Sequence, residues 1–239
     1  MNKPILIGAA VETELEFLIN KLENVVKRKI DDYDFWEGMI NSFPVVVYKT
    51  EVGTINATMS TVIAIKEYNP MFIVNEGTAG SHINTLLPGD IVIGKEIIAI
   101  DSYKSNNRKL GEGSNPFEWS IAGFSNEKAI ECDKELLNFA LKIKKFYHDG
   151  KVCVARIGSG NVFNKEADRI KNLYEKVNTV CEEMEGIGVY KVCNRLNVPV
   201  ISFRVISNNE ILGMRYDVSY GKKSQIFSYE FVKRYIEDK

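Results

Sequence analysis

Apolar and polar residues follow two distinct patterns along the chain. Residues 4–10 form a nearly continuous apolar run, and the segment 12–22 then carries apolar residues at the spacing of one helix face. This order predicts a strand that leads into a helix. Alternating apolar and polar positions next predict a group of hairpin strands over 25–30, 33–40 and 43–50.

The strand-then-helix unit recurs through the rest of the chain, and the glycine-rich segment 76–80 predicts a turn. Apolar runs predict further strands over 72–75, 90–100, 152–157 and 198–206. Helical spacing predicts helices over 55–68, 134–146, 165–174, 183–196 and from residue 222 onwards. This alternation is typical of an α/β fold. We therefore expect one domain over 1–239, a three-layer α/β/α sandwich around a central mixed, mostly parallel sheet.

The composition indicates a globular protein that acts on a small molecule. The 239 residues are 45% hydrophobic and 26% charged, with a net charge of −1. Such a balance gives no field that would gather nucleic acid or an anionic membrane surface. The apolar runs are also far shorter than the roughly 20 residues that cross a bilayer. We expect a small-molecule ligand and neither a nucleic-acid nor a membrane partner.

The cysteines and histidines form no recognisable metal-binding motif. The 4 cysteines include no CxxC pair, and only 2 histidines are present. The N-terminal apolar run meets acidic residues early and lacks the longer apolar stretch of a signal peptide. We expect reduced thiols, a cytoplasmic location and no metal ion.

Polar and small residues gather directly after the predicted strands. In open α/β sheets, ligands bind beyond the carboxyl ends of the strands, so these segments are the place to search for a site. They are 10–14, 76–80, 158–164, 182–185 and 204–210.

Taken in order, motifs in these segments resemble the nucleoside phosphorylase and nucleosidase superfamily. Within it, the chain is most similar to the 5′-methylthioadenosine/S-adenosylhomocysteine nucleosidases. The motifs are ILIGAAVETEL, EVGTINATMSTVIAI, FIVNEGTAGS, LLPGDIVIG, GSGNVF, EEMEGIGVYKVCNRLNVP and VISFRVISNN. The resemblance implies hydrolysis of a purine N-glycosidic bond without metal or organic cofactor.

Cleavage of this bond passes through a ribosyl cation, so the site needs a base for water and groups that hold the sugar. By resemblance, Glu14 is the general base, Glu185 binds the ribose hydroxyls and Met184 packs under the sugar. Without the resemblance, Glu14 would be an ordinary acidic residue in a first helical turn. Glu182 and Glu183 also fit acidic residues at a helix N-terminus, although Glu183 stays among the substrate-binding candidates.

The resemblance also assigns groups around the purine and the water. Phe163 stacks on the purine, and the backbone of Asn164 reads the purine edge. Arg204 and Ser207 help to place the water and the acid, and Thr78 lies where nucleosidases place the water. The alternative for Arg204 and Ser207 is a sheet-end ion pair and a cap.

Missing arginines favour hydrolysis over phosphorolysis. The phosphorylases of this superfamily carry an arginine two residues before the first glycine of the turn, where this chain has Asn75. The segment 10–14 contains no arginine either. Phosphate needs arginine or lysine donors to leave water.

Asn208 departs from the nucleosidase pattern, which has at this position an aspartate that protonates purine N7. An amide donates and accepts hydrogen bonds but gives up no proton, and loss of a general acid costs about 100- to 10,000-fold in rate. Three explanations account for Asn208. The enzyme is weakened, or inactive so that the protein only binds nucleosides; the substrate carries a different purine; or the substitution was introduced. The different purine would be a 6-oxopurine, in an inosine- or futalosine-like substrate of a hydrolase or phosphorylase.

Two further expectations concern the surroundings of the site. The polar loop 102–124 carries Lys104, Arg108 and Lys109, which are either a solvated surface or contacts for an acidic 5′ group. The resemblance implies a homodimer in which a neighbour closes the 5′ pocket. The apolar residues of 55–65 either form that interface or pack on the sheet.

Overall fold

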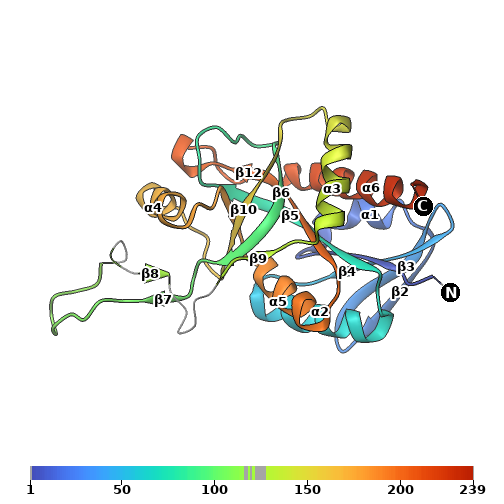
Figure 1. Cartoon of the computed structure of the whole chain (residues 1–239), viewed down its shortest axis with the longest axis horizontal. Helices are drawn as coiled ribbons and strands as arrows, with labels where there is room; N and C mark the ends of the chain where they lie inside the picture. Colours follow the sequence, from blue (N-terminus) through green and yellow to red (C-terminus); the bar gives the residue numbers. More distant parts are fainter. Residues whose placement is uncertain (1, 116–117, 119, 122–127, 239) are drawn as a thin grey trace.

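The computed structural model describes residues 2–115, 118, 120–121 and 128–238. Within them, ten strands form one mixed sheet with helices on both faces (Figure 1). The strands are β1 Ile5–Ala9, β2 Glu23–Ile30, β3 Tyr33–Ile40, β4 Phe43–Lys49, β5 Phe72–Ser81, β6 Ile91–Ala99, β9 Ile130–Glu131, β10 Val152–Ser159, β11 Cys181–Glu183 and β12 Val200–Asn208. The α/β fold with a mixed sheet confirms the predicted fold class.

The helices cover the sheet in two layers. They are α1 Glu16–Ile19, α2 Thr54–Tyr68, α3 Lys134–Ile143, α4 Ala167–Val177, α5 Gly186–Leu196 and α6 Gly221–Glu237. Buried side chains of α1, α3 and α6 share one hydrophobic core with one face of the sheet, and those of α2 and α5 share another core on the opposite face (Figure 1). No helix of the described residues is long and apolar enough to cross a membrane.

The strand β5 organises the part of the sheet that matters for function. It pairs in parallel with β1 and β12, and further along it pairs antiparallel with β11. Because β11 also pairs with β10, the strands β5, β12, β6, β10 and β11 close into a ring. The closure brings the carboxyl ends of β12, β10 and β11 around the second half of β5.

The predicted hairpins β2–β3 and β3–β4 are present, and their turns follow from the sequence. Asp31 and Asp32 have φ angles of 47° and 68°, and Asn41 and Ser42 have 50° and 63°. Two-residue hairpin loops need this left-handed conformation at both positions, which Asn and Asp tolerate better than most residues.

Three predicted boundaries are wrong. The helix expected over 12–22 is a short 3₁₀ turn at Glu12–Glu14 followed by α1. The segment 76–80 is not a turn, because β5 continues through it with Gly77 at a φ of 153°, a conformation that side chains rarely adopt. The helix expected over 183–196 begins only at Gly186, because Glu182 and Glu183 belong to β11.

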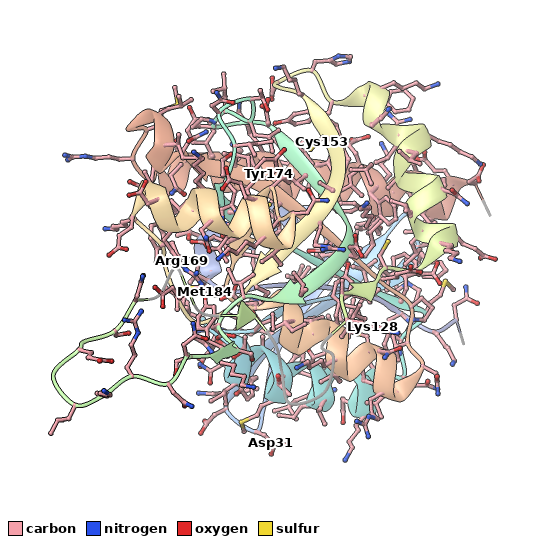
Figure 2. All side chains as sticks on the ribbon, turned by 60° about the vertical axis from the view of Figure 1, so that its left-hand side comes forward. Asp31, Lys128, Cys153, Arg169, Tyr174 and Met184 are labelled. Carbon is pink, nitrogen blue, oxygen red and sulfur yellow. The ribbon has the colours of Figure 1, made fainter. Side chains whose placement is uncertain are left out.

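The polar loop stands away from the body of the molecule (Figures 1 and 2). It contains the two-residue strands β7 Tyr103–Lys104 and β8 Ser120–Ile121. Arg108 pairs with Glu118 across this loop, and Lys104 and Lys109 are exposed. The polar loop predicted over 102–124 lies partly outside the described residues.

A close contact between α2 and α5 fixes one wall of the ligand-facing end of the sheet. A Cβ on Gly188 would lie 2.6 Å from the Thr54 carbonyl oxygen and 2.6 Å from Thr58 Oγ1. The absence of a side chain therefore lets the start of α2 approach α5.

We expect Gly188→Ala to lower the free energy of unfolding by about 1–3 kcal/mol, because the methyl group must push the Thr54 backbone away. Urea denaturation measures this. Asn194→Ala, on the exposed side of the same helix, is the control and should stay within about 0.5 kcal/mol of the parent chain. Equal stability of all three proteins would contradict the close contact.

Candidate active site

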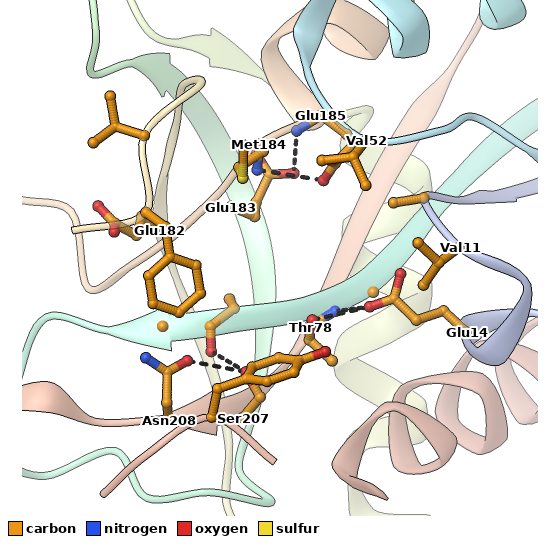
Figure 3. Close-up of a pocket in the computed structure, with 17 residues that line it drawn as sticks. Val11, Glu14, Val52, Thr78, Glu182, Glu183, Met184, Glu185, Ser207 and Asn208 are labelled. Carbon is orange, nitrogen blue, oxygen red and sulfur yellow. Dashed lines mark hydrogen bonds between the residues drawn. The ribbon is translucent and has the colours of Figure 1, made fainter. Parts of the chain in front are cut away.

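A single cavity at the ends of the strands collects most of the predicted site residues (Figure 3). Of the predicted set, only Asn164 and Arg204 do not line it. The lining residues are Ala10, Val11, Glu14, Val52, Gly77, Thr78, Ala79, Gly80, Val162, Phe163, Glu182, Glu183, Met184, Glu185, Ser207, Asn208 and Tyr216. Five segments far apart in the sequence thus meet at one place, as the strand-end argument predicted.

Glu14 lies at one end of the cavity and is fixed by β5 (Figure 3). Its Oε1 accepts hydrogen bonds from the backbone nitrogen and the Oγ1 of Thr78, at 3.0 and 2.9 Å. A Cβ on Gly77 would lie 3.4 Å from this carboxylate. The side chain is 5% exposed, so the carboxylate is held in place with little access to bulk water.

A second carboxyl group, Glu76, lies behind Glu14 and outside the cavity. Its side chain is buried, and neither oxygen has a hydrogen-bond partner among the described residues. Burial raises the pKa of Glu76 well above its ordinary value, and the nearby charge of Glu14 adds to this rise. Burial beside a second carboxyl group thus favours the neutral form of Glu76.

Glu185 enters the cavity from the N-terminus of α5. Its Oε1 accepts from the Gly53 backbone nitrogen at 2.9 Å, and its Oε2 accepts from the Met184 nitrogen at 3.3 Å. Burial raises the pKa of Glu185 to about 7, Glu183 adds to the rise, and the Gly53 hydrogen bond opposes it. Met184 lines the cavity beside it.

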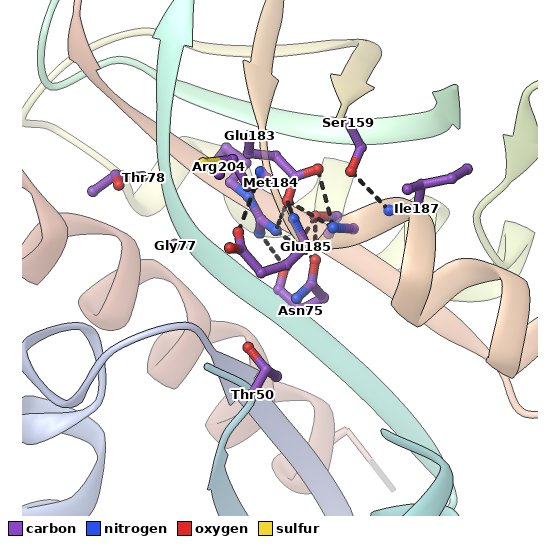
Figure 4. A network of polar contacts seen from close by, with 12 residues as sticks. Thr50, Asn75, Gly77, Thr78, Ser159, Glu183, Met184, Glu185, Ile187 and Arg204 are labelled. Atoms are coloured by element: carbon purple, nitrogen blue, oxygen red, sulfur yellow. Dashed lines mark hydrogen bonds and ion pairs between the residues drawn. The ribbon is translucent and has the colours of Figure 1, made fainter. Parts of the chain in front are cut away.

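Glu183 and Arg204 form a buried ion pair behind the cavity (Figure 4). Arg204 Nη2 lies 2.6 Å from Glu183 Oε2, and both side chains are 1% exposed. Arg204 also donates to the Asn75 backbone oxygen and side-chain oxygen on β5, at 2.8 and 2.5 Å. The Glu183 carboxylate also accepts from the Gly186 backbone nitrogen at the start of α5, which lies 3.0 Å from Oε1 and 2.8 Å from Oε2.

These contacts show the structural role that the sequence analysis considered for each of Glu183 and Arg204. Glu183 does serve the helix N-terminus, and Arg204 does form an ion pair at the sheet end. The charged ends of the two side chains face each other, and this ion pair links β11 to β12. Arg204 extends the link to β5 through Asn75, and Glu183 also lines the cavity. Both oxygens of Asn75, at the position that the sequence analysis compared with an arginine of the phosphorylases, accept hydrogen bonds from Arg204.

Ser207 and Asn208 are the last two residues of β12 and lie at the opposite end of the cavity from Glu14 (Figure 3). Asn208 Nδ2 donates to Glu210 Oε1 at 3.2 Å, and Asn208 Oδ1 lies 3.1 Å from Ser207 Oγ. The Ser207 hydroxyl is also 3.2 Å from the Ala79 oxygen. Since a carboxylate only accepts, Glu210 fixes which side of the amide is the donor.

Phe163 lines the mouth of the cavity and keeps 47% of its surface exposed. Its ring contacts Tyr216 edge-to-face, with centroids 6.4 Å apart. An exposed aromatic face beside a cavity is available for a flat ligand ring. Tyr216 was missed at the sequence level because it lies in an irregular segment with no periodicity.

Glu182 was also missed, because its interpretation as a helix N-terminal residue is wrong. It belongs to β11, and its carboxylate binds Asn164 and His82 while lining the cavity. His82 is buried beside this carboxylate.

No lysine or arginine of the described residues lines the cavity, whereas four glutamates do. Lys104, Arg108 and Lys109 lie outside it, which agrees with a solvated surface rather than with contacts to an acidic 5′ group. The described residues also hold no group of three or more histidine, cysteine or acidic side chains that would bind a metal ion. The cavity therefore suits a cationic or neutral ligand better than an anion.

Known proteins resemble the chain over nearly its whole length. A 5′-methylthioadenosine/S-adenosylhomocysteine nucleosidase of Bacillus cytotoxicus is 29% identical over 239 residues, with 98% of each chain covered. The crystal structure of such a nucleosidase from Neisseria meningitidis, in complex with methylthio-immucillin-A, has a TM-score of 0.82 at 22% identity and covers 97% of this chain and 99% of that one.

The fold is shared with a futalosine hydrolase of Helicobacter pylori, whose structure has a TM-score of 0.79 at 19% identity and covers 97% of this chain and 98% of that one. A family model described as the phosphorylase superfamily matches residues 4–232. This match covers the strand-end motifs and the strands β5 and β11 that close the sheet. The chain therefore belongs to the phosphorylase superfamily.

Proposed function

We propose that this chain hydrolyses the N-glycosidic bond of a purine nucleoside. The relatives described above are named for this activity, as 5′-methylthioadenosine/S-adenosylhomocysteine nucleosidases. The observation that carries the proposal is the set of buried carboxylates in a cavity without a basic lining residue among those described. Such a site stabilises a ribosyl cation and excludes phosphate as the nucleophile.

The catalytic carboxylates divide the work by position. Glu14, oriented by Thr78, takes a proton from water so that the hydroxide attacks the anomeric carbon. Glu185 accepts hydrogen bonds from the ribose hydroxyls and offsets the positive charge that develops on the sugar ring. Met184 packs against the sugar. Arg204 acts through Glu183 and is a positioning residue in this scheme.

The departing purine binds between Phe163 and the end of β12. Asn208 donates a hydrogen bond to the base, whereas the nucleosidase pattern supplies a carboxylic acid there. This difference favours a second candidate, a hydrolase of 6-oxopurine nucleosides, whose bases leave more easily when O6 and N7 accept hydrogen bonds. The nucleoside-binding protein without turnover is disfavoured by the ordered geometry of Glu14.

The direct test is chromatography of free base after incubation with 5′-methylthioadenosine, 5′-methylthioinosine, adenosine and inosine, with and without phosphate. We expect base release at the same rate in both buffers. Glu14→Gln should lower kcat by about 100- to 10,000-fold, because it removes the general base. Glu12→Gln, at an exposed residue of the same 3₁₀ turn, is the control. Release that needs phosphate, or full activity of Glu14→Gln, would contradict the proposal.

The raised pKa of Glu185 gives a pH dependence. The charged form is the active one, and protonation occurs as the pH falls below about 7, so kcat/KM should fall up to tenfold per pH unit on the acid side. Glu185→Gln should lose this limb of the profile and about 100-fold or more of its activity. A limb near pH 7 that persists in Glu185→Gln would assign it to another group.

We also propose a cytoplasmic homodimer that associates through α2. Ile55 and Met59 on this helix are 73% and 52% exposed, and Val52, which lines the cavity, is 49% exposed. Other apolar residues of the helix, such as Ala57 and Ile65, pack on the sheet. The two interpretations of 55–65 therefore apply to opposite faces of α2, and a partner on the exposed face would reach the cavity wall.

Light scattering should give a mass of twice the 27.1 kDa chain. Ile55→Asp should give the monomer, because a carboxylate replaces the most exposed apolar residue of α2. Leu110→Asp, a fully exposed apolar residue of the polar loop, is the matched control and should remain dimeric. A monomeric parent chain, or a dimer with Ile55→Asp, would exclude this interface.

A further inference from the structure

The turn that carries Glu14 is too short to hold itself in place. It consists of the 3₁₀ helix Glu12–Glu14 and the four-residue helix α1, whose N-cap residues Val11 and Leu15 are apolar and cannot cap a helix with their side chains. The first backbone N–H groups of a helix have no partner within it, and a single helical turn gains little from its own hydrogen bonds. The position of Glu14 therefore depends on contacts from elsewhere in the fold.

The side chain of Gln225, on α6, supplies two of these contacts. Its Oε1 accepts from the backbone nitrogen of Phe17, the second residue of α1, at 2.7 Å. Its Nε2 donates to the carbonyl oxygen of Thr13 at 2.9 Å. Gln225 is 1% exposed, so water does not compete for these hydrogen bonds. One buried amide thus fixes the backbone directly before Glu14 and three residues after it.

The face of α6 that carries Gln225 lies along the whole turn. Gly221, Gln225 and Tyr229 are spaced four residues apart, so they share one face of the helix. A Cβ on Gly221 would lie 3.5 Å from Glu14 Cγ, and the Tyr229 ring contacts Phe17 edge-to-face with centroids 6.0 Å apart. The helices α1 and α6 lie on the same side of the sheet (Figure 1). Gln225 is the central and polar contact of this face.

The neighbouring Ser224 joins α6 to the strand that holds the Glu14 carboxylate. Its Oγ accepts from the Gly77 backbone nitrogen at 3.3 Å, directly before Thr78 on β5. Both hydrogen bonds that described residues give to the carboxylate come from Thr78 and end on Oε1, so Oε2 is the oxygen left for water. A misplacement of about 1 Å in such a geometry can cost about 100-fold in rate.

We propose that Gln225 is a positioning residue for the general base, which fixes the backbone on both sides of Glu14 so that Oε2 meets the attacking water. The inference rests on the proposed hydrolysis, in which Glu14 takes the proton. Gln225 does not line the cavity, so it acts through Glu14 and not on the substrate. The alternative is that Gln225 only attaches α6 to the body of the molecule.

Gln225→Met tests the inference, because it keeps the length of the side chain and removes both hydrogen bonds. With the nucleoside that the parent chain hydrolyses fastest, kcat should fall about 10- to 100-fold and KM should stay within about threefold. In a Glu14→Gln background, the same substitution should lower kcat by less than about threefold, because the base that Gln225 positions is already gone.

Phe227→Leu is the matched control. Phe227 is a buried residue of α6 that packs on Phe203 in the core and makes no listed contact with the Glu14 turn, so the variant loosens the helix alone. Its kcat should stay within about twofold of the parent chain at temperatures where both are folded. An equal loss of kcat in Phe227→Leu, or the same factor for Gln225→Met with and without Glu14, would overturn the inference.

Amide hydrogen exchange, followed by NMR, tests the same inference without catalysis. The Thr78 amide donates to Glu14, so its exchange reports how firmly the carboxylate is held. Gln225→Met should speed this exchange about tenfold or more relative to the Val74 amide of the same strand. An unchanged ratio would overturn the inference. A parent chain that releases no base would refute the proposed hydrolysis instead, and the exchange ratio would then decide alone whether Gln225 positions Glu14.

Discussion

The buried ion pair between Glu183 and Arg204 holds the ligand-facing end of the molecule together. It joins β11 to β12, and through Asn75 it joins both to β5. Removal of one partner would leave a buried charge without compensation, which typically costs about 3–5 kcal/mol. The same Glu183 carboxylate accepts from the start of α5, and the two residues between, Met184 and Glu185, line the cavity.

Around this pair, the remaining cavity carboxylates are oriented by backbone, hydroxyl, amide and imidazole groups rather than by lysine or arginine side chains. Thr78 holds Glu14, the Gly53 backbone holds Glu185, and Asn164 with His82 holds Glu182. No lysine or arginine of the described residues therefore offsets these carboxylates within the cavity lining. A desolvated, anionic cavity with fixed geometry stabilises positive charge that develops in a reaction, and it opposes the entry of phosphate.

The sequence allowed the fold class and the place of the site to be predicted, because strand ends are marked by small and polar residues after apolar runs. Glu14, Thr78 and Asn208 meet as expected. The three-residue strand β11 was missed because so short a segment shows no periodicity, and its pairing with β5 is long-range. The directions of Glu182 and Glu183 depend on that pairing, so the contact between Glu182 and His82 had no local signal.

The central claim is that the fixed carboxylates stabilise a cationic sugar. Calorimetry at pH 8 tests it with two purine analogues, one in which a protonated pyrrolidine replaces the ribose ring and one with an uncharged cyclopentane ring. The account predicts that the cation binds about 100-fold more tightly or better, as transition-state analogues do. Equal affinity of the two analogues would contradict it.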